Sequence, residues 1–301
     1  MRARRALVVI ADDFGMGPAT SQGILDLAGR GVVTGSVLMV NSPHAEAAVR
    51  AWRQAGCPME LGWHPSLTSD GPMLPPERVP SLVRPDGAFH PLGQFMKWLW
   101  LGRIEAEEIH AELRAQHARF RELIGHPPTV VNSHQHVSLF GSVGPILLDV
   151  LADQRPLPYV RCVREPWRML WNIRGARIKR AFLSRYGKPA GRRQQAQGFP
   201  GNDWLAGITD PPWVTDPQFF VRWLSRIPGD VVELACHPGY HDPTLIGRDC
   251  TSDDGLLQRR VDELKLLSEP SFIEACRAAG FERVSPAELV GFHGARISHA
   301  A

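Results

Sequence analysis

The sequence predicts an α/β protein built around a mostly parallel sheet. Short apolar runs of strand length alternate with segments of helix length, which is the pattern of βαβ units. The 301 residues are 44% hydrophobic and 22% charged, an ordinary globular composition with ample material for a core. Neither an internal repeat nor a low-complexity linker divides the chain, so we expect a single domain over residues 1–301.

The expected elements follow one another along the chain. Residues 6–11 are continuously apolar, as in a strand buried on both faces. Residues 18–30 predict a helix, with Pro18 near its first turn and Gly31 after its end. Residues 104–124 form the clearest helix pattern, because large apolar side chains recur on one face. Further strands are expected at residues 32–40, 59–67, 129–136, 159–163 and 231–236, and further helices at 43–55, 143–152, 256–267 and 271–279.

Two segments interrupt this alternation. Residues 68–91 are rich in proline and glycine and predict a long loop. Residues 155–207 are basic, contain tryptophan and fit no simple βα unit, so we interpret them as an insertion. Between positions 155 and 193, twelve basic side chains accompany a single acid, Glu165. The basic residues are Arg155, Arg161, Arg164, Arg168, Arg174, Arg177, Lys179, Arg180, Arg185, Lys188, Arg192 and Arg193.

The basic insertion has three possible interpretations. A basic helix with one apolar face can lie in a membrane interface, and Trp167, Trp171 and Phe182 stand among these arginines. Alternatively, the apolar face packs on the rest of the protein and the arginines are solvated. Nucleic acid is the weakest candidate partner, because no recognised binding module is present, and we expect none.

The cysteines and the N-terminal sequence indicate the cellular compartment in which we expect the protein. The five cysteines form no CxxC pair and their number is odd, so we expect no disulfide framework and a reducing cytoplasm. The start MRARRALVVIADD imitates a signal peptide, but its apolar run is too short and no cleavage site follows. No apolar stretch of about 18 residues predicts a transmembrane helix.

Polar residues suited to catalysis follow several of the expected strands. In a parallel sheet or barrel, the carboxyl ends of all strands face one side, where ligands and catalytic groups belong. Distant segments should therefore meet there as a cluster of carboxylates and imidazoles. Its candidate members are Asp12, Asp13, His64, His134, His136 and His237.

A divalent metal ion would explain why two carboxylates, Asp12 and Asp13, stand side by side. Imidazole nitrogen and carboxylate oxygen are common zinc ligands, and catalytic zinc sites usually combine three protein ligands with water. One carboxylate can bind the cation while the other accepts a proton from water, whose pKa the metal lowers toward ~7. Mixed nitrogen and oxygen ligation allows zinc, which is the ion we expect, with magnesium as the alternative.

Each of these features alone has a simpler explanation. A pair of aspartates after a strand is often a turn or helix cap, and a lone His64 is more often packed or hydrogen-bonded. His134 and His136 are a stronger pair, because alternate strand residues point to the same face. Gly15 and Gly17 lack the third glycine of a dinucleotide-binding loop, and nearby carboxylates would repel a pyrophosphate. It is the combination that indicates a metal site.

Four strings of the sequence resemble those of a known family. ADDFG, GWHPSLT, NSHQHVS and CHPGY are similar to ADDFG, GLHLNLT, DSHHHVH and CHPGY in the YdjC-like carbohydrate deacetylases. The resemblance runs from Leu7 to about Leu289, with the strings in order. REPWRMLWN and KWLWLGR resemble the hopanoid-biosynthesis-associated members, often called HpnK. The resemblance implies a distorted TIM-like β/α barrel related to polysaccharide deacetylases, with the basic, Trp-rich insertion at about 155–207.

The resemblance also implies roles for the clustered residues. Asp13, His64 and His134 would be the ligands of a single divalent metal ion. Asp12 would be the general base, and His237 a general acid or an oxyanion partner. The reaction would be hydrolysis of an N-acetyl group on an amino sugar, with release of acetate.

This chain departs from the family strings at several positions. Asn132 stands where the family usually has aspartate, and Ser138 where it often has histidine. Trp63 and Pro65 flank His64, which we expect to narrow the pocket. These differences bear on substrate choice more than on the metal site, and they leave the role of His136 open.

The sequence therefore predicts a metal-dependent carbohydrate N-deacetylase. The expected substrate is an N-acetylglucosamine unit, on a glycosylated hopanoid lipid that the enzyme reaches by peripheral contact with the inner face of the cytoplasmic membrane. A soluble chitooligosaccharide is the second choice. A phosphoesterase would require a second metal and more carboxylates, and a sugar-binding protein with a relict site would not need all of these residues.

Overall fold

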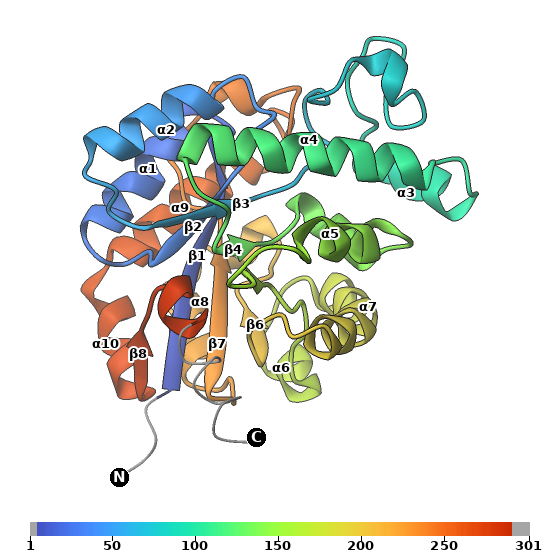
Figure 1. Ribbon diagram of the computed structural model, residues 1–301. Coiled ribbons are helices and arrows are strands. Elements are labelled where there is room, and N and C mark those ends of the chain that lie inside the picture. Colours follow the sequence, from blue (N-terminus) through green and yellow to red (C-terminus); the bar gives the residue numbers. More distant parts are fainter. Residues whose placement is uncertain (1–4, 291–301) are drawn as a thin grey trace.

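The computed structural model describes residues 5–290 of the chain, and its centre is a curved parallel sheet (Figure 1). The strand order is β5-β4-β3-β2-β1-β7-β6, and β8 pairs with the first residues of β1. All of these strand pairs are parallel. The strands are β1 (Arg5–Phe14), β2 (Gly35–Leu38), β3 (Glu60–Trp63), β4 (Val130–Val131), β5 (Tyr159–Val160), β6 (Trp204–Ala206), β7 (Val231–Cys236) and β8 (Phe281–Arg283).

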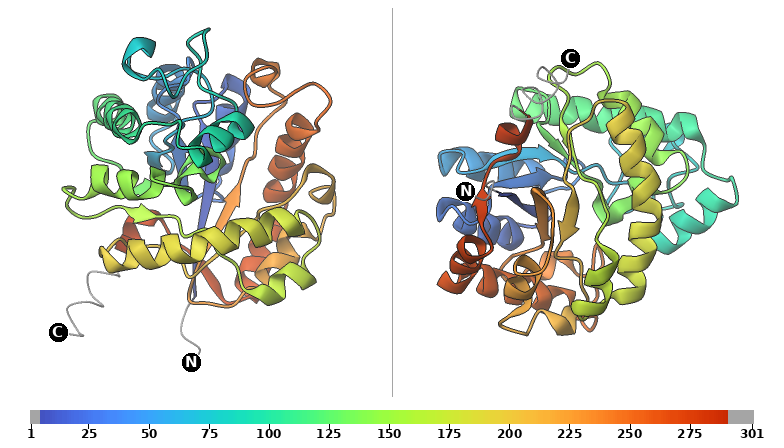
Figure 2. Two further views of the ribbon diagram at one scale, coloured as in Figure 1. Left: turned by 90° about the vertical axis from the view of Figure 1, so that its right-hand side faces the viewer. Right: turned by 90° about the horizontal axis from the view of Figure 1, so that it is seen from below.

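Helices surround this sheet (Figures 1 and 2). They are α1 (Pro18–Gly29), α2 (Ala45–Gln54), α3 (Leu92–Trp100), α4 (Ala106–Ile124), α5 (Val143–Leu151), α6 (Trp167–Asn172), α7 (Arg177–Ala196), α8 (Phe219–Leu224), α9 (Leu256–Ser268) and α10 (Pro270–Ala278). Short 3₁₀ turns are η1 (Pro76–Arg78), η2 (His134–Leu139), η3 (Pro211–Trp213) and η4 (Pro243–Leu245). Strands alternating with helices confirm the predicted α/β class.

The two edges of the sheet approach each other. The backbone N–H of Val160, in β5, donates to the carbonyl of Pro200 at 2.8 Å, just before β6. Leu205, in β6, donates in turn to the carbonyl of Arg164 at 2.8 Å. These bonds join the edges without forming a regular strand pair, so the sheet is a distorted TIM-like barrel, as the family resemblance implies.

The central strand, β1, is buried along most of its length. Leu7, Val8, Val9 and Ile10 are fully buried, which explains the continuous apolar run at this position. Its neighbours β2 and β7 occupy both edges, so no backbone hydrogen-bonding group of its middle part faces water. The aspartate pair lies at the carboxyl end of this buried central strand.

The predicted strand lengths need correction. The strand expected at 129–136 ends at Val131, and the strand expected at 32–40 is only Gly35–Leu38. The long loop at 68–91 is confirmed, apart from η1 and one isolated bridge. The segment at 155–207 follows the α/β pattern more closely than expected, because β5, α6, α7 and β6 form a β–helix–β connection. Helices α3 and α8 and strands β6 and β8 were missed, since their apolar runs are short.

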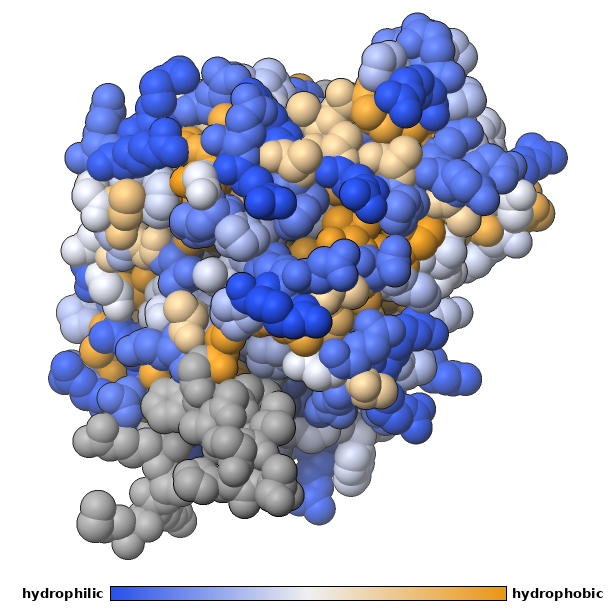
Figure 3. Space-filling model, viewed as in Figure 1, coloured by the Kyte–Doolittle hydropathy of each residue, from blue (hydrophilic) through white to orange (hydrophobic). Residues whose placement is uncertain are grey.

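Surface character varies over the molecule. On the face shown in Figure 3, hydrophilic side chains predominate and apolar side chains gather mainly near its middle. Among the described residues, none of the helices combines the length and apolarity needed to cross a bilayer.

Candidate metal and catalytic site

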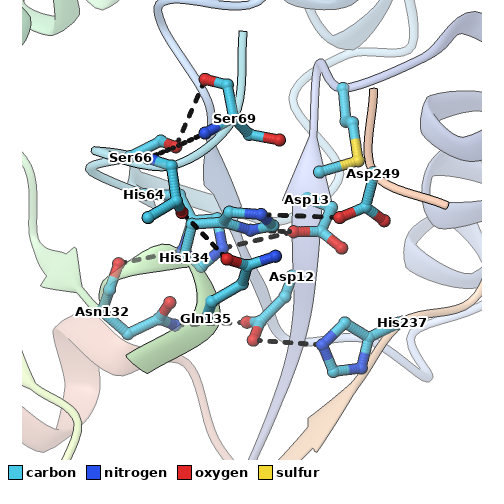
Figure 4. Close-up of polar contacts among 12 residues, drawn as sticks. Asp12, Asp13, His64, Ser66, Ser69, Asn132, His134, Gln135, His237 and Asp249 are labelled. Carbon is cyan, nitrogen blue, oxygen red and sulfur yellow. Dashed lines mark hydrogen bonds and ion pairs between the residues drawn. The ribbon is translucent and has the colours of Figure 1, made fainter. Parts of the chain in front are cut away.

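The candidate residues meet in one pocket at the carboxyl ends of the strands (Figure 4). Asp12 and Asp13 belong to β1, and His64 directly follows β3. His134 begins η2 after β4, and His237 directly follows β7. The pocket has a volume of about 440 Å³ and is lined by all five side chains. Topology thus brings together segments more than 200 residues apart, as expected for strand ends of a parallel barrel.

A bulge in β1 lets adjacent aspartates serve the same site. Opposite β2, Ala11 pairs with Ser36 and Phe14 with Leu38, so β1 holds one extra residue between these pairs. Asp13 there has a positive φ of 65°, a conformation that costs energy for a residue other than glycine. Successive side chains of a regular strand point to opposite faces, and the bulge removes that alternation. The predicted strand end at Ala11 is therefore wrong, because the strand continues to Phe14.

Asp13, His64 and His134 form a compact buried triad. Oδ1 of Asp13 lies 3.3 Å from Nε2 of His64 and 3.2 Å from Nδ1 of His134. One potential ligand atom from each residue lies within 4.8 Å of the others, so the triad could hold a metal ion. All three side chains are buried, which shields such an ion from bulk water.

The hydrogen bonds around the triad also fit a cation. Nδ1 of His64 lies 2.9 Å from the backbone carbonyl of Asn132, which can only accept a hydrogen bond. The proton of neutral His64 is therefore on Nδ1, and Nε2 presents a lone pair toward Asp13. Nε2 of His134 is buried and lacks a hydrogen-bond partner. A metal ion beside Asp13 would therefore meet the lone pair of His64 Nε2, whereas Nε2 of His134 lies 3.5 Å from Asp249.

Two charged residues next to the triad were not foreseen. Arg260 on α9 reaches Asp13 at 2.7 Å and Asp249 at 2.9 Å, and Asp249 lies 3.5 Å from Nε2 of His134. Burial would raise the pKa of Asp13, but Arg260 and the two histidines hold it well below its usual value. Burial likewise opposes ionisation of His134, yet Asp13 and Asp249 raise its pKa to about 10. A proton on His134 therefore compensates the carboxylates, and a metal ion would replace it.

Asp12 stands apart from the triad in a different hydrogen-bond network. Arg161 binds its two carboxylate oxygens at 2.6 and 2.8 Å, and the side-chain amide of Asn132 donates to it at 3.2 Å. Although burial opposes this, Arg161 keeps the pKa of Asp12 far below the usual range. Behind Arg161 lies Glu233, 2.5 Å from its Nε and 2.8 Å from the hydroxyl of Tyr159. Asp12 is thus an oriented carboxylate beside the triad.

His237 closes the other side of the pocket floor. Its Nε2 lies 3.7 Å from Oδ2 of Asp12, and 28% of its side chain is exposed to the pocket. Arg259 approaches the opposite ring nitrogen, Nδ1, at 3.2 Å. Burial first and the charge of Arg259 second lower the pKa of His237 to about 4, so the ring is neutral near pH 7.

His136 does not join His134. Because the chain leaves the sheet after Val131, the two histidines lie in η2, where Gln135 and His136 have positive φ values of 50° and 57°. The prediction that both histidines share one strand face is therefore wrong. His136 lines the pocket, but it is not part of the triad. Burial lowers its pKa well below the usual value.

Some of the missed residues left a signal in the sequence, and others left none. Arg161 in YVRCV and Glu233 in VVELAC are isolated charges within apolar strand runs. A charge at such a position requires a buried partner, and each proves to be the partner of the other. Arg260 and Asp249 gave no comparable signal, because a helix surface and a polar loop are ordinary places for charges.

The outer wall of the pocket is apolar. Helix α3 and helix α7 contribute most of it, and both can be followed in Figure 2. The apolar lining residues include Leu92, Met96, Trp100, Phe140, Phe182 and Leu183. A polar floor beneath an apolar wall fits a ligand with a polar reacting group and a less polar body.

Comparison with known proteins agrees with this description. The family of YdjC-like proteins matches residues 6–278. A chitooligosaccharide deacetylase of Serratia marcescens is 30% identical over 285 residues, which cover 92% of this chain and 96% of that protein. A chitooligosaccharide deacetylase of Yersinia pestis (strain Pestoides F) is 26% identical over 281 residues, with the same coverages of 92% and 96%.

A solved structure extends the likeness to three dimensions. A protein of Enterococcus faecalis V583, described as a cellobiose-phosphate cleavage protein, superposes with a TM-score of 0.76 at 25% identity. The match covers 95% of this chain and 99% of that one. The fold and the buried site thus define an α/β-barrel protein with a candidate metal centre. More specifically, the chain belongs to the YdjC-like protein family.

Proposed function

We propose that this protein is a metal-dependent N-deacetylase of amino sugars. The observation that carries the proposal is the separation of Asp12 from the triad of Asp13, His64 and His134. One adjacent carboxylate lies among potential metal ligands, and the other is held by Arg161 with an oxygen facing the pocket and His237. A hydrolase of this kind needs both a ligand and a base at one place.

The residues divide the proposed chemistry among themselves. A divalent ion held by Asp13, His64 and His134 would polarise the acetyl carbonyl and lower the pKa of water. Asp12 accepts the proton of the attacking water, in an orientation that Arg161 fixes. His237 faces the same space, where it acts on the tetrahedral intermediate either as an acid or as a hydrogen-bond donor. The donor set of one oxygen and two nitrogens favours zinc over magnesium.

The pocket supports an amphiphilic substrate. We propose an N-acetylglucosamine unit on a hopanoid lipid, because the wall that α3 and α7 form beside the polar floor is apolar. Trp100 and Phe182 line this wall and are 62% and 41% exposed, so apolar surface continues from the pocket to the outside. A soluble chitooligosaccharide is the second candidate, and the names of the Serratia and Yersinia relatives favour it.

We also propose that α6 and α7 contact an anionic membrane from the cytoplasmic side. Trp167 and Trp171 on α6 are 66% and 69% exposed, and Ile178 on α7 is 89% exposed. Exposed arginines accompany these apolar side chains, which is the composition of an interfacial surface. Only part of the segment packs inward, since Met169, Ile173 and Leu183 are buried and the tryptophans are not.

Acetate release tests the proposed function. Purified protein should release acetate from N-acetylglucosaminyl substrates after loading with zinc, and a chelator should abolish the release until zinc is restored. An N-acetylglucosaminyl lipid and chitobiose, supplied in parallel, distinguish the two substrate classes. Absence of acetate from every acetamido sugar with the metal demonstrably bound would refute the proposal.

A further inference from the structure

We propose that Arg259 is a positioning residue that holds His237 as a neutral imidazole with its proton on Nε2. In that form His237 donates a hydrogen bond to the oxyanion of the tetrahedral intermediate and does not protonate the leaving amine. The second part rests on the proposed deacetylase function. The first part concerns the free protein and stands independently of it.

The hydrogen-bond partner of Nδ1 assigns this tautomer. Nη2 of Arg259 lies 3.2 Å from Nδ1 of His237. A guanidinium group has only donors, so Nδ1 must accept and cannot carry the proton of the neutral ring. His64 shows the opposite arrangement, because its Nδ1 faces a backbone carbonyl and must donate. The protein thus prepares one histidine as a lone-pair donor to a metal ion and the other as an N–H donor.

Arg259 is itself held firmly. Its Nε donates to Oε1 of Glu263 at 2.7 Å, and the other oxygen of Glu263 accepts the backbone N–H of His237 at 2.5 Å. Nη1 of Arg259 points to the carbonyl of Thr209 at 3.4 Å. Arg259 is 8% exposed and Glu263 is 1% exposed, so water competes little for these bonds. The carboxylate of Glu263 on α9 therefore orients both the backbone of His237 and the guanidinium group of Arg259 beside its ring.

The other ring nitrogen has the complementary environment. Nε2 of His237 faces Oδ2 of Asp12 at 3.7 Å, and a carboxylate only accepts hydrogen bonds. The charged and titratable groups that act on the ring are Asp12 and Asp13 on β1, Arg259 and Glu263 on α9, and His136 on η2. Burial of the ring has the largest effect and the charge of Arg259 the next largest, and together they lower the pKa of His237 to about 4. The low pKa is consistent with a neutral donor that is not charged near neutral pH.

This assignment determines the path of the proton. The attacking water gives a proton to Asp12 as its oxygen bonds to the acetyl carbon, and the carbonyl oxygen becomes the oxyanion. When the carbon–nitrogen bond breaks, the leaving nitrogen takes that same proton from Asp12. Amide and water are thereby converted to amine and acetic acid, and His237 returns with its Nε2 proton unchanged.

The tautomer can be measured directly in the full-length, zinc-loaded protein. Histidine labelled with ¹⁵N and long-range ¹H–¹⁵N spectra distinguish protonated from unprotonated ring nitrogens, and the signals lost in His237→Gln identify His237. We expect Nε2 protonated and Nδ1 unprotonated at neutral pH. Proton on Nδ1, or a doubly protonated ring, would overturn the proposal even if the enzyme is fully active.

Kinetics separate the donor role from the acid role. His237→Gln keeps a neutral N–H donor but has no proton to give up, whereas His237→Ala has neither. We expect His237→Ala to lose ~10²–10³ in kcat, the usual effect of removing one oxyanion donor, with little change in KM. His237→Gln should retain at least tenfold more activity than His237→Ala. Equal loss in the two variants would show that His237 acts as an acid.

Arg259 variants test positioning. Arg259→Met should give a mixture of His237 tautomers and lower kcat at unchanged zinc content, while Arg259→Lys should restore part of both. If Arg259→Met does not fold, the wild-type spectrum and the Gln–Ala comparison still decide the proposal. Complete absence of deacetylation would refute the proposed function, and the spectrum would still report on Arg259.

Discussion

Arginines play opposite parts in two regions of the molecule, the floor of the pocket and the outer surface of α6 and α7. On the floor, Arg161 and Arg260 are buried and bind Asp12 and Asp13 at 2.6–2.7 Å. On the outer surface, Arg168, Arg174 and Arg177 are exposed to solvent. The same residue type fixes catalytic groups in one region and supplies diffuse charge in the other.

The boundary between the two roles runs through the basic segment itself. Arg161 belongs to the pocket floor, and Arg180 on α7 is buried against Glu165 and three backbone carbonyls. The single acid of the segment is therefore occupied by a buried arginine. The excess of positive charge on the surface is smaller than the twelve basic residues indicate, and burial decides what each one does. Breaking a buried ion pair costs about 3–5 kcal/mol, whereas an exposed pair contributes at most ~1 kcal/mol.

The largest effect is expected from His134→Ala on the pocket floor. Loss of one of three ligands should remove the bound metal and reduce deacetylation to the limit of detection. Metal content by mass spectrometry, measured with acetate release, checks this. His126→Ala, at an exposed histidine outside the pocket, should keep both metal and activity. Retention of the full metal content in His134→Ala would remove His134 from the ligand set.

Asp12→Asn should separate the base from the ligands. The substitution keeps the shape of the side chain and leaves Arg161 its bond to Glu233, so we expect folding and metal content to be preserved. Activity should fall by ~10²–10⁴, the usual contribution of a general base. Asp153→Asn on the surface is the matched control. Loss of metal in Asp12→Asn, together with retained metal but lost activity in Asp13→Asn, would mean that base and ligand are exchanged.

The sequence predicted the strand ends better than the interior of the pocket. Asp13, His64 and His134 could be found because short polar strings follow apolar runs, and parallel topology brings such strings together. The bulge at Asp13 could not be foreseen, since one extra residue in a strand leaves no mark in an apolar pattern. Arg260 and Arg259 look like ordinary surface charges of α9, and only tertiary packing buries them beneath the pocket.

Arg180→Met tests whether the buried part of the basic segment is structural. Removing the guanidinium leaves Glu165 without its arginine partner. It also removes the hydrogen bonds to the backbone carbonyls of Ile173 and Met169. We expect destabilisation by about 3–5 kcal/mol, as for other broken buried pairs, measured by chemical denaturation. Arg177→Met, at an exposed site on the same helix, should change stability by less than ~0.5 kcal/mol. Equal small effects would remove the distinction between the two sets of arginines.

The smallest effect on catalysis, and the sharpest test of the outer surface, is expected from Arg168, Arg174 and Arg177 changed together to Glu. Basic residues at an anionic membrane contribute on the order of 1 kcal/mol each, and salt screens them. Binding to phosphatidylserine vesicles should therefore rise with anionic lipid, fall with salt and weaken strongly in this variant.

The control is a triple variant with the same change of charge elsewhere. Arg50 on α2, Arg84 in the loop before α3 and Arg114 on α4 are exposed, and their replacement by Glu should affect vesicle binding far less. Deacetylation of a small soluble acetamido sugar should remain unchanged in both variants, because neither set of side chains lines the pocket. If the α6–α7 variant and wild type sediment equally with vesicles, these arginines do not hold the protein at the membrane, and the interpretation in which the segment packs on the rest of the protein is the better one.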